Sequence, residues 1–110
     1  MGMYNILKTE VQCAYCKNFF EGNIQFKFGD TWLYEYSIGD AIKWGGLDVG
    51  SSSYDKVKVY GLLEEDKCLI CGLEIEYEYD IIVEKNIIKC VIPISSMDEY
   101  NSTDGNYHVL

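Results

Sequence analysis

The segment Leu73-Glu-Ile-Glu-Tyr-Glu-Tyr-Asp-Ile-Ile-Val-Glu84 decides the fold class, because its side chains alternate in character with a period of two. Apolar or aromatic residues occupy the odd positions, and every even position except Ile82 is acidic. Successive side chains of a strand point to opposite faces, so the pattern predicts a β-strand with one face against a core and the other in water. The acidic face comprises Glu74, Glu76, Glu78, Asp80 and Glu84.

A second strand is predicted directly after this segment, over residues 87–92. If Lys85-Asn86 forms a two-residue turn, apolar side chains meet on one face of the hairpin. The predicted pairs are Val83 with Ile88, Ile81 with Cys90, and Tyr79 with Ile92. This register puts Cys90 on the inner face, where a cysteine behaves as a small buried hydrophobe.

A similar alternation upstream predicts an aromatic hairpin around a loop at Gly29-Asp30-Thr31. Its predicted pairs are Phe28 with Trp32, Phe26 with Tyr34, and Ile24 with Tyr36. Another strand is predicted over residues 56–60, and the glycine- and serine-rich residues 45–54 predict a loop. Residues 1–12 have the character of a mixed lead-in, and Ser96-Met-Asp-Glu99 fits a capping box that begins a brief helix.

The fold class predicted from these patterns is mainly β, an antiparallel sheet of hairpins with at most one short helix. At 110 residues the chain has the size of one domain. We expect this domain over residues 1–94 and a polar C-terminal tail over 95–110.

Four of the five cysteines form two C-x-x-C pairs, Cys13-Ala-Tyr-Cys16 and Cys68-Leu-Ile-Cys71. In a chain without a visible secretory signal, such pairs indicate a metal site more readily than disulfides. Four thiolates can close a tetrahedral site around Zn²⁺. Because protein fills all four positions, such a site is structural, and the sequence predicts a structural zinc.

With these cysteines and with Gly72 after the second pair, the chain resembles the zinc-ribbon superfamily, in which two cysteine-rich knuckles share one zinc. The spacing differs, because 51 residues separate Cys16 from Cys68 where ~15–20 are typical. The insert, residues 19–67, is therefore expected to form a β-sheet of its own between the knuckles. Short segments of the chain are similar to small uncharacterised bacterial proteins of this split-ribbon kind; they are Ile24-Gln-Phe-Lys-Phe28, Tyr36-Ser-Ile-Gly-Asp40 and Trp44-Gly-Gly46.

Two alternatives remain for the cysteines. A rubredoxin-like iron site also uses two C-x-x-C pairs but usually has glycine after both, whereas Lys17 follows the first pair here. Free thiols or disulfides are the other alternative. A thioredoxin-like redox pair would need a βαβ pattern, which the sequence lacks.

The charge pattern bears on partners. Eighteen acidic residues against nine basic ones, all lysine, give a formal net charge of −9. A chain this acidic, without arginine, is repelled by a nucleic-acid backbone. No apolar run approaches the ~20 residues of a membrane-spanning helix, and no signal peptide is visible, so we expect a cytoplasmic protein without membrane contact.

No catalytic group is apparent, and we expect that the protein is not an enzyme. His108 is the single histidine and is the third residue from the end of the sequence. Gly45-x4-Gly50-Ser51 has the spacing of a phosphate loop but lacks its lysine and the following helix. Carboxylates on a wet strand face do not have the contrasting environments of an acid–base pair.

The expected function is protein–protein interaction with a partner that has a basic surface, in the manner of a bacterial immunity or antitoxin protein. The expected contacts are the acidic strand residues and two loop aromatics, namely Glu74, Glu76, Glu78, Trp44 and Tyr54. The alternative is a nucleic-acid-binding zinc ribbon that stacks bases on an aromatic strand face formed by Trp32, Tyr34 and Tyr36.

Overall fold

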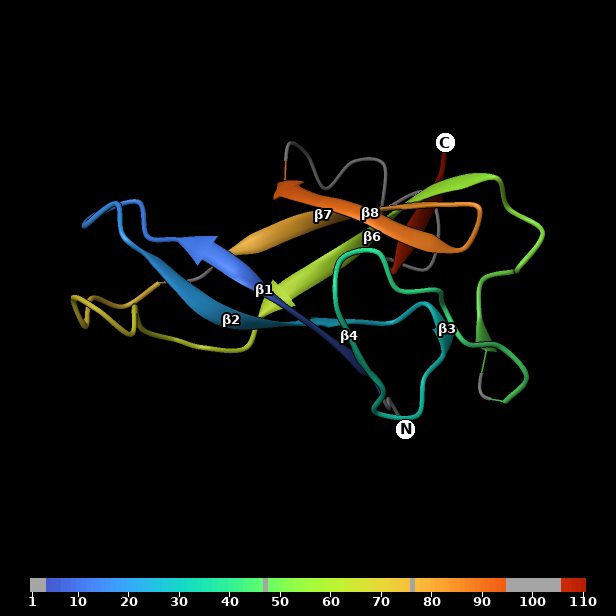
Figure 1. The fold of residues 1–110 in the computed structure, drawn as a ribbon, viewed down its shortest axis with the longest axis horizontal. Coiled ribbons are helices and arrows are strands. Elements are labelled where there is room, and N and C mark those ends of the chain that lie inside the picture. Colours follow the sequence, from blue (N-terminus) through green and yellow to red (C-terminus); the bar gives the residue numbers. More distant parts are fainter. Residues whose placement is uncertain (1–3, 47, 76, 95–105) are drawn as a thin grey trace.

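The protein folds as a curled β-sheet (Figure 1), as the sequence predicts. The computed structural model describes residues 4–46, 48–75, 77–94 and 106–110, and this part of the chain contains no helix. The main sheet has the strand order β4-β1-β2-β6-β7-β8, with β9 also pairing with β6, while β3 and β5 form a separate two-stranded sheet. The strands are β1 (Asn5–Gln12), β2 (Phe19–Phe26), β3 (Gly29–Asp30), β4 (Glu35–Tyr36), β5 (Asp48–Val49), β6 (Lys56–Leu63), β7 (Glu78–Glu84), β8 (Ile87–Pro93) and β9 (Tyr107–Val109).

The sequence predicted only a mixed lead-in over residues 1–12, whereas residues 5–12 form strand β1. All eight of them pair with β2 in antiparallel register. Leu7 and Val11 point into the core, but the polar residues Asn5 and Thr9 hold the other inward positions and hide the alternation. Asn5 is fully buried, and its side-chain amide donates to the carbonyls of Phe28 (3.2 Å) and Asp30 (3.0 Å).

The predicted aromatic hairpin does not form. Phe26 pairs instead with Asn5 of β1 and Gly61 of β6, and the chain leaves the sheet after it. The buried Asn5 side chain explains the departure, because it also accepts a hydrogen bond from the backbone of Tyr34 (3.1 Å) and so ties the loop to β1. Tyr36 returns in β4, parallel to β1, whereas Trp32 remains 57% exposed.

The hairpin of β7 and β8 keeps the predicted turn but not the predicted register. Val83 pairs with Ile88 as expected, and a β-bulge follows, so that Ile82 rather than Ile81 lies opposite Cys90. One extra residue in β8 turns each later side chain to the other face, because the side-chain period is two. Cys90 is therefore exposed, which contradicts its predicted burial.

The alternating acidic segment is also shorter as a strand than predicted. β7 begins at Glu78, and the predicted inward residue Leu73 is 48% exposed. Asp80, predicted to face water, is buried (2% exposed) opposite Tyr60 of β6. Lys58, of opposite charge, is also buried and lies two residues from Tyr60 on β6, so polar groups on this face of the sheet are withdrawn from solvent.

The insert between the cysteine pairs is not the separate sheet that we expected. Its long strands β2 and β6 lie in the middle of the main sheet, next to β1 and β7. The sheet therefore has one hydrophobic core, which includes Leu7, Ile24, Val59 and Ile81.

The end of the chain is part of the sheet, although its sequence predicted a polar tail. β9 pairs with β6 through Val57–Val109, Lys58–His108 and Val59–Tyr107. Tyr107 packs on Phe28, with ring centroids 5.6 Å apart, which explains why a largely polar segment is held. The predicted capping box at 96–99 lies outside the described residues. No helix in the described part of the chain has the length and apolar character needed to cross a membrane.

Candidate metal centre

The first knuckle, residues 13–18, is the turn that joins β1 to β2. The N–H of Cys13 donates to the carbonyl of Asn18 (3.0 Å), and the N–H of Lys17 donates to the carbonyl of Cys13 (3.0 Å). Lys17 adopts a left-handed backbone conformation, with φ of 62°. Two long paired strands therefore fix the position of Cys13 and Cys16.

The second knuckle, residues 68–73, repeats this arrangement in the loop between β6 and β7. The N–H of Cys68 donates to the carbonyl of Leu73 (2.9 Å), and the N–H of Gly72 donates to the carbonyl of Cys68 (2.9 Å). Gly72 has the left-handed φ of 76° that the corresponding Lys17 also adopts. A single bridge between Lys67 and Glu74 closes the base of this knuckle.

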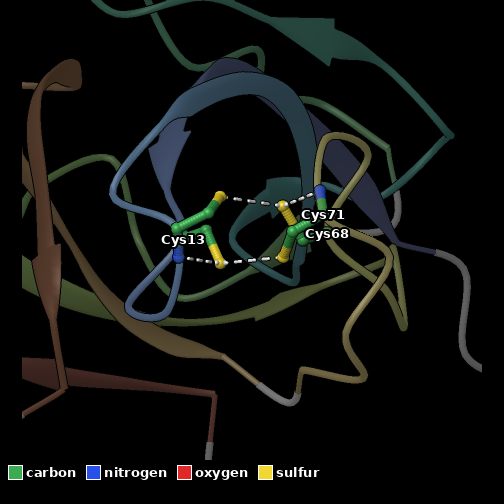
Figure 2. Close-up of side chains that lie close together, drawn as sticks. Cys13, Cys68 and Cys71 are labelled. Carbon is green, nitrogen blue, oxygen red and sulfur yellow. Dashed lines mark hydrogen bonds between the residues drawn. The ribbon is translucent and has the colours of Figure 1, made fainter.

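The two knuckles bring four sulfur atoms together, as Figure 2 shows. The Sγ atoms of Cys13 and Cys71 are 3.7 Å apart, as are those of Cys16 and Cys68, and all four lie within 4.8 Å of one another. A tetrahedron with metal–sulfur bonds of about 2.3 Å has edges of about 3.8 Å, close to these distances. A disulfide would bring two sulfurs to about 2.05 Å, so the spacing is that of metal ligands.

Backbone amides of each knuckle point at its first sulfur. The N–H groups of Tyr15 and Cys16 donate to Cys13 Sγ (3.4 and 3.5 Å), and those of Ile70 and Cys71 donate to Cys68 Sγ (both 3.4 Å). Donors aimed at sulfur stabilise the thiolate form, which is the form that binds metal. A two-residue spacer produces this arrangement, because the tight turn between the two cysteines directs its N–H groups toward the first sulfur.

The thiols do not ionise equally. The hydrogen bond from the backbone of Cys16 lowers the pKa of Cys13 to about 6, against opposing desolvation, and the bond from the backbone of Cys71 similarly lowers the pKa of Cys68. A hydrogen bond from the backbone of Leu73 favours the thiolate of Cys71, but desolvation and the neighbouring sulfurs together outweigh it and raise the pKa of Cys71 to about 11. Thiols this close repel one another as anions, so a cation is needed before all four are thiolates.

The centre is also linked to the sheet. Cys13 and Cys68 are buried in the hydrophobic core, whereas Cys71 is exposed. The N–H of Ala14 donates to the hydroxyl of Tyr77 (2.8 Å), which connects the first knuckle to the chain just before β7. Among the described residues, these four cysteines are the one group of cysteine, histidine and acidic side chains found close enough together to hold a metal.

The other residues selected from the sequence are dispersed. Glu74 is exposed beside the second knuckle, Glu78 is half-buried at the start of β7, and Glu76 lies outside the described residues. Trp44 and Tyr54 are half-buried against the core rather than projecting from a loop. The rings of Trp44 and Phe28 have centroids 5.3 Å apart, and the buried indole Nε1 of Trp44 has no partner among the described groups.

A group of exposed apolar side chains at the knuckles was missed by the sequence analysis. Their exposed fractions run from 48% to 66%. We call this group the knuckle patch, and its residues are Tyr15, Phe19, Leu69, Ile70 and Leu73. Three of them, Tyr15, Leu69 and Ile70, lie between the cysteines of the C-x-x-C pairs, where a short turn has no core to bury them. Large apolar residues at these positions could therefore have predicted an exposed apolar surface.

No protein-family model matches the chain, and no curated protein or solved structure matches it significantly.

Proposed function

We propose that the protein is a non-catalytic module in which Cys13, Cys16, Cys68 and Cys71 hold a structural Zn²⁺ and display a protein-binding surface. Four sulfur ligands at tetrahedral spacing support the metal. When bound, the ion supplies a cross-link between distant segments and leaves no open coordination position for a substrate.

Zinc is favoured over iron by the first knuckle. Rubredoxin-like iron sites usually have glycine after both pairs, whereas Lys17 occupies that position here. Both ions accept four thiolates at similar distances, so the metal itself must be measured. Elemental analysis of gently purified protein should give one zinc per chain and no iron absorption. A coloured, iron-containing protein, or an oxidised protein with two disulfides, would contradict the zinc assignment.

The observation that carries the binding function is the knuckle patch. Two segments about fifty residues apart in sequence present large apolar side chains beside one candidate metal centre. Exposed apolar groups collected in this way are typical of interaction sites. The net charge of −9 favours a partner with a basic surface, as an immunity or antitoxin role would require.

No structural observation favours the nucleic-acid alternative. Its stacking face required Trp32, Tyr34 and Tyr36 side by side on a strand, but Tyr36 is buried (3% exposed). Tyr34 is half-buried, and its ring is covered by the ammonium of Lys43, 4.3 Å from the centroid. Of these three aromatic residues, Trp32 alone is open to stack on a base.

Site-specific photo-crosslinking tests the interface. A photoreactive residue at Ile70, within the knuckle patch, is expected to form a crosslink to one protein in the source cells. The same residue at Val109, which is 42% exposed in β9, is the matched control and should not. Equal crosslinking from both positions, or none from Ile70 in zinc-loaded protein, would contradict the proposal.

A further inference from the structure

A groove of about 830 Å³ lies between the two edges of the curled sheet. One wall is formed by residues 9–12 of β1, and the other by residues 89–91 of β8 together with Pro93. The core-facing side chains Val11, Tyr79 and Val91 line it, so much of its surface is apolar. The sheet is therefore open along this seam.

The β1 wall has backbone groups without a strand partner among the described residues. β4 pairs with β1 only at Ile6 and Leu7, where the N–H of Ile6 donates to the carbonyl of Tyr34 (2.9 Å). Backbone groups of alternate residues in a strand point to the same side. The edge away from β2 therefore carries, beyond the pairing with β4, the N–H and C=O groups of Glu10 and Gln12.

The β8 wall has the same character. The N–H of Ile94 donates to the carbonyl of Glu78 (3.2 Å), toward β7. By the same alternation, the backbone groups of Val91 and Pro93 face away from β7, toward the open side. Proline is tolerated at such a position, because an edge residue needs no N–H for the ladder.

The chain itself fills the other end of this seam. β4 pairs with Ile6 and Leu7 of β1. Just after β4, the N–H of Gly39 donates to the carbonyl of Ile88 (2.7 Å), and the N–H of Ile88 donates to the carbonyl of Asp40 (3.0 Å). Residues 35–42 thus hydrogen bond to both edges of the sheet. Ile38 of this segment also lines the groove, so the groove continues the space that the segment fills. An occupant that continues this pattern must supply a backbone to both walls.

We propose that the groove binds an extended segment of a partner protein, which adds as a strand between β1 and β8. Its backbone pairs with the two open edges, and alternate apolar side chains pack on Val11 and Tyr79. The carboxylates of Glu10 and Glu78 outnumber the ammonium of Lys89 in the lining, so basic residues are favoured at the intervening positions. This inference rests on the proposed function only in assuming a protein partner. The groove shares Phe19 with the knuckle patch, whereas Tyr15, Leu69, Ile70 and Leu73 do not line it.

Zinc-loaded protein and a synthetic peptide test the proposal. The probe is a terminally blocked peptide of about six residues, a usual strand length, with alternating valine and lysine. Calorimetry and amide NMR should show saturable binding, with shifts concentrated in residues 8–12 and 89–93. N-methylation of alternate peptide bonds removes donors and should weaken binding by about tenfold or more. A valine–glutamate peptide should bind more weakly than the lysine peptide.

Protein variants test the edge directly. Glu10→Pro removes an outward N–H from β1 and should lower affinity by about tenfold, whereas Glu10→Gln keeps that N–H and should retain most of the affinity. Circular dichroism and zinc content check that each variant is folded. If the Glu10→Pro variant does not fold, Val91→Pro tests the same pairing on the β8 wall.

Several results would overturn the proposal. They are no saturable binding, equal binding of the N-methylated peptide, or concentration-dependent dimerisation through the groove, which would assign it to a second copy of the chain. Because purified protein and peptides are used, such a failure leaves the crosslinking test at Ile70 unaffected, and failure at Ile70 leaves the groove unaffected.

Discussion

The two knuckles have the same internal hydrogen bonds but very different support. The first joins two eight-residue strands that pair along their whole length, from Asn5–Phe26 to Gln12–Phe19. The second lies within residues 64–77, where the described backbone forms one isolated bridge, between Lys67 and Glu74, and single hydrogen bonds such as that from the N–H of Glu64 to the carbonyl of Asn23 (2.8 Å). The comparison teaches that the sheet itself positions one half of the candidate metal centre, while only a few contacts hold the other half.

Removing a ligand should have the largest effect, and it should be equal for the two knuckles. Cys13→Ser and Cys68→Ser each break the tetrahedral set, and structural zinc contributes on the order of 10 kcal/mol in finger peptides. We expect loss of bound zinc and a large fall in the melting temperature. Cys90→Ser is the matched control, because Cys90 is exposed and lies outside the cluster. A Cys68→Ser protein that keeps its melting temperature would refute a structural metal.

Chelation should separate the knuckles. Without metal, amide hydrogens of residues 64–77 should exchange quickly, because local opening there breaks few backbone hydrogen bonds. Amides of β1 and β2 should stay protected, since their pairing does not involve the metal. Hydrogen exchange monitored by mass spectrometry measures both regions in one sample. Simultaneous loss of protection in both regions would show that the strands β1 and β2 do not hold the first knuckle in place without metal.

The left-handed residues provide a smaller test with opposite signs. A Cβ at Gly72 would meet no atom within 4 Å, so Gly72→Ala changes only the backbone preference at φ of 76° and should destabilise by about 1 kcal/mol. Lys17→Gly relieves the same strain at φ of 62° but adds entropy to the unfolded chain, for a net gain of roughly 0.5 kcal/mol. Denaturant unfolding of zinc-loaded protein measures both, and a shared sign would contradict the equivalence of the knuckles.

The link between the first knuckle and the β7 side should contribute least. Tyr77→Phe removes the hydroxyl that accepts from the N–H of Ala14, at an exposed position, and should lower stability by about 0.5 kcal/mol. Tyr15→Phe is the control, because Tyr15 is 66% exposed and its hydroxyl makes no bond among those described. An equal effect of both substitutions would show that the hydrogen bond between Ala14 and Tyr77 does not stabilise the protein.

Much of the fold class and the grouping of the cysteines could be predicted from local sequence. Strand alternation depends on neighbouring residues only, and the spacing within a C-x-x-C pair is set by one turn. The strand at residues 5–12 was missed because Asn5, a polar residue, fills a core position and satisfies its amide with distant carbonyls of Phe28 and Asp30. Such a partner cannot be seen from a local pattern.

The sequence by itself determined that the protein is mainly β and that four thiols form the candidate metal centre, because both properties follow from short-range periodicity and spacing. Only the tertiary structure decided that the insert joins the main sheet and that the bulge in β8 exposes Cys90. It also decided that β1 and β8 leave a groove between them. These features depend on which strands pair and in what register, and that choice is made by the free energy of the whole core.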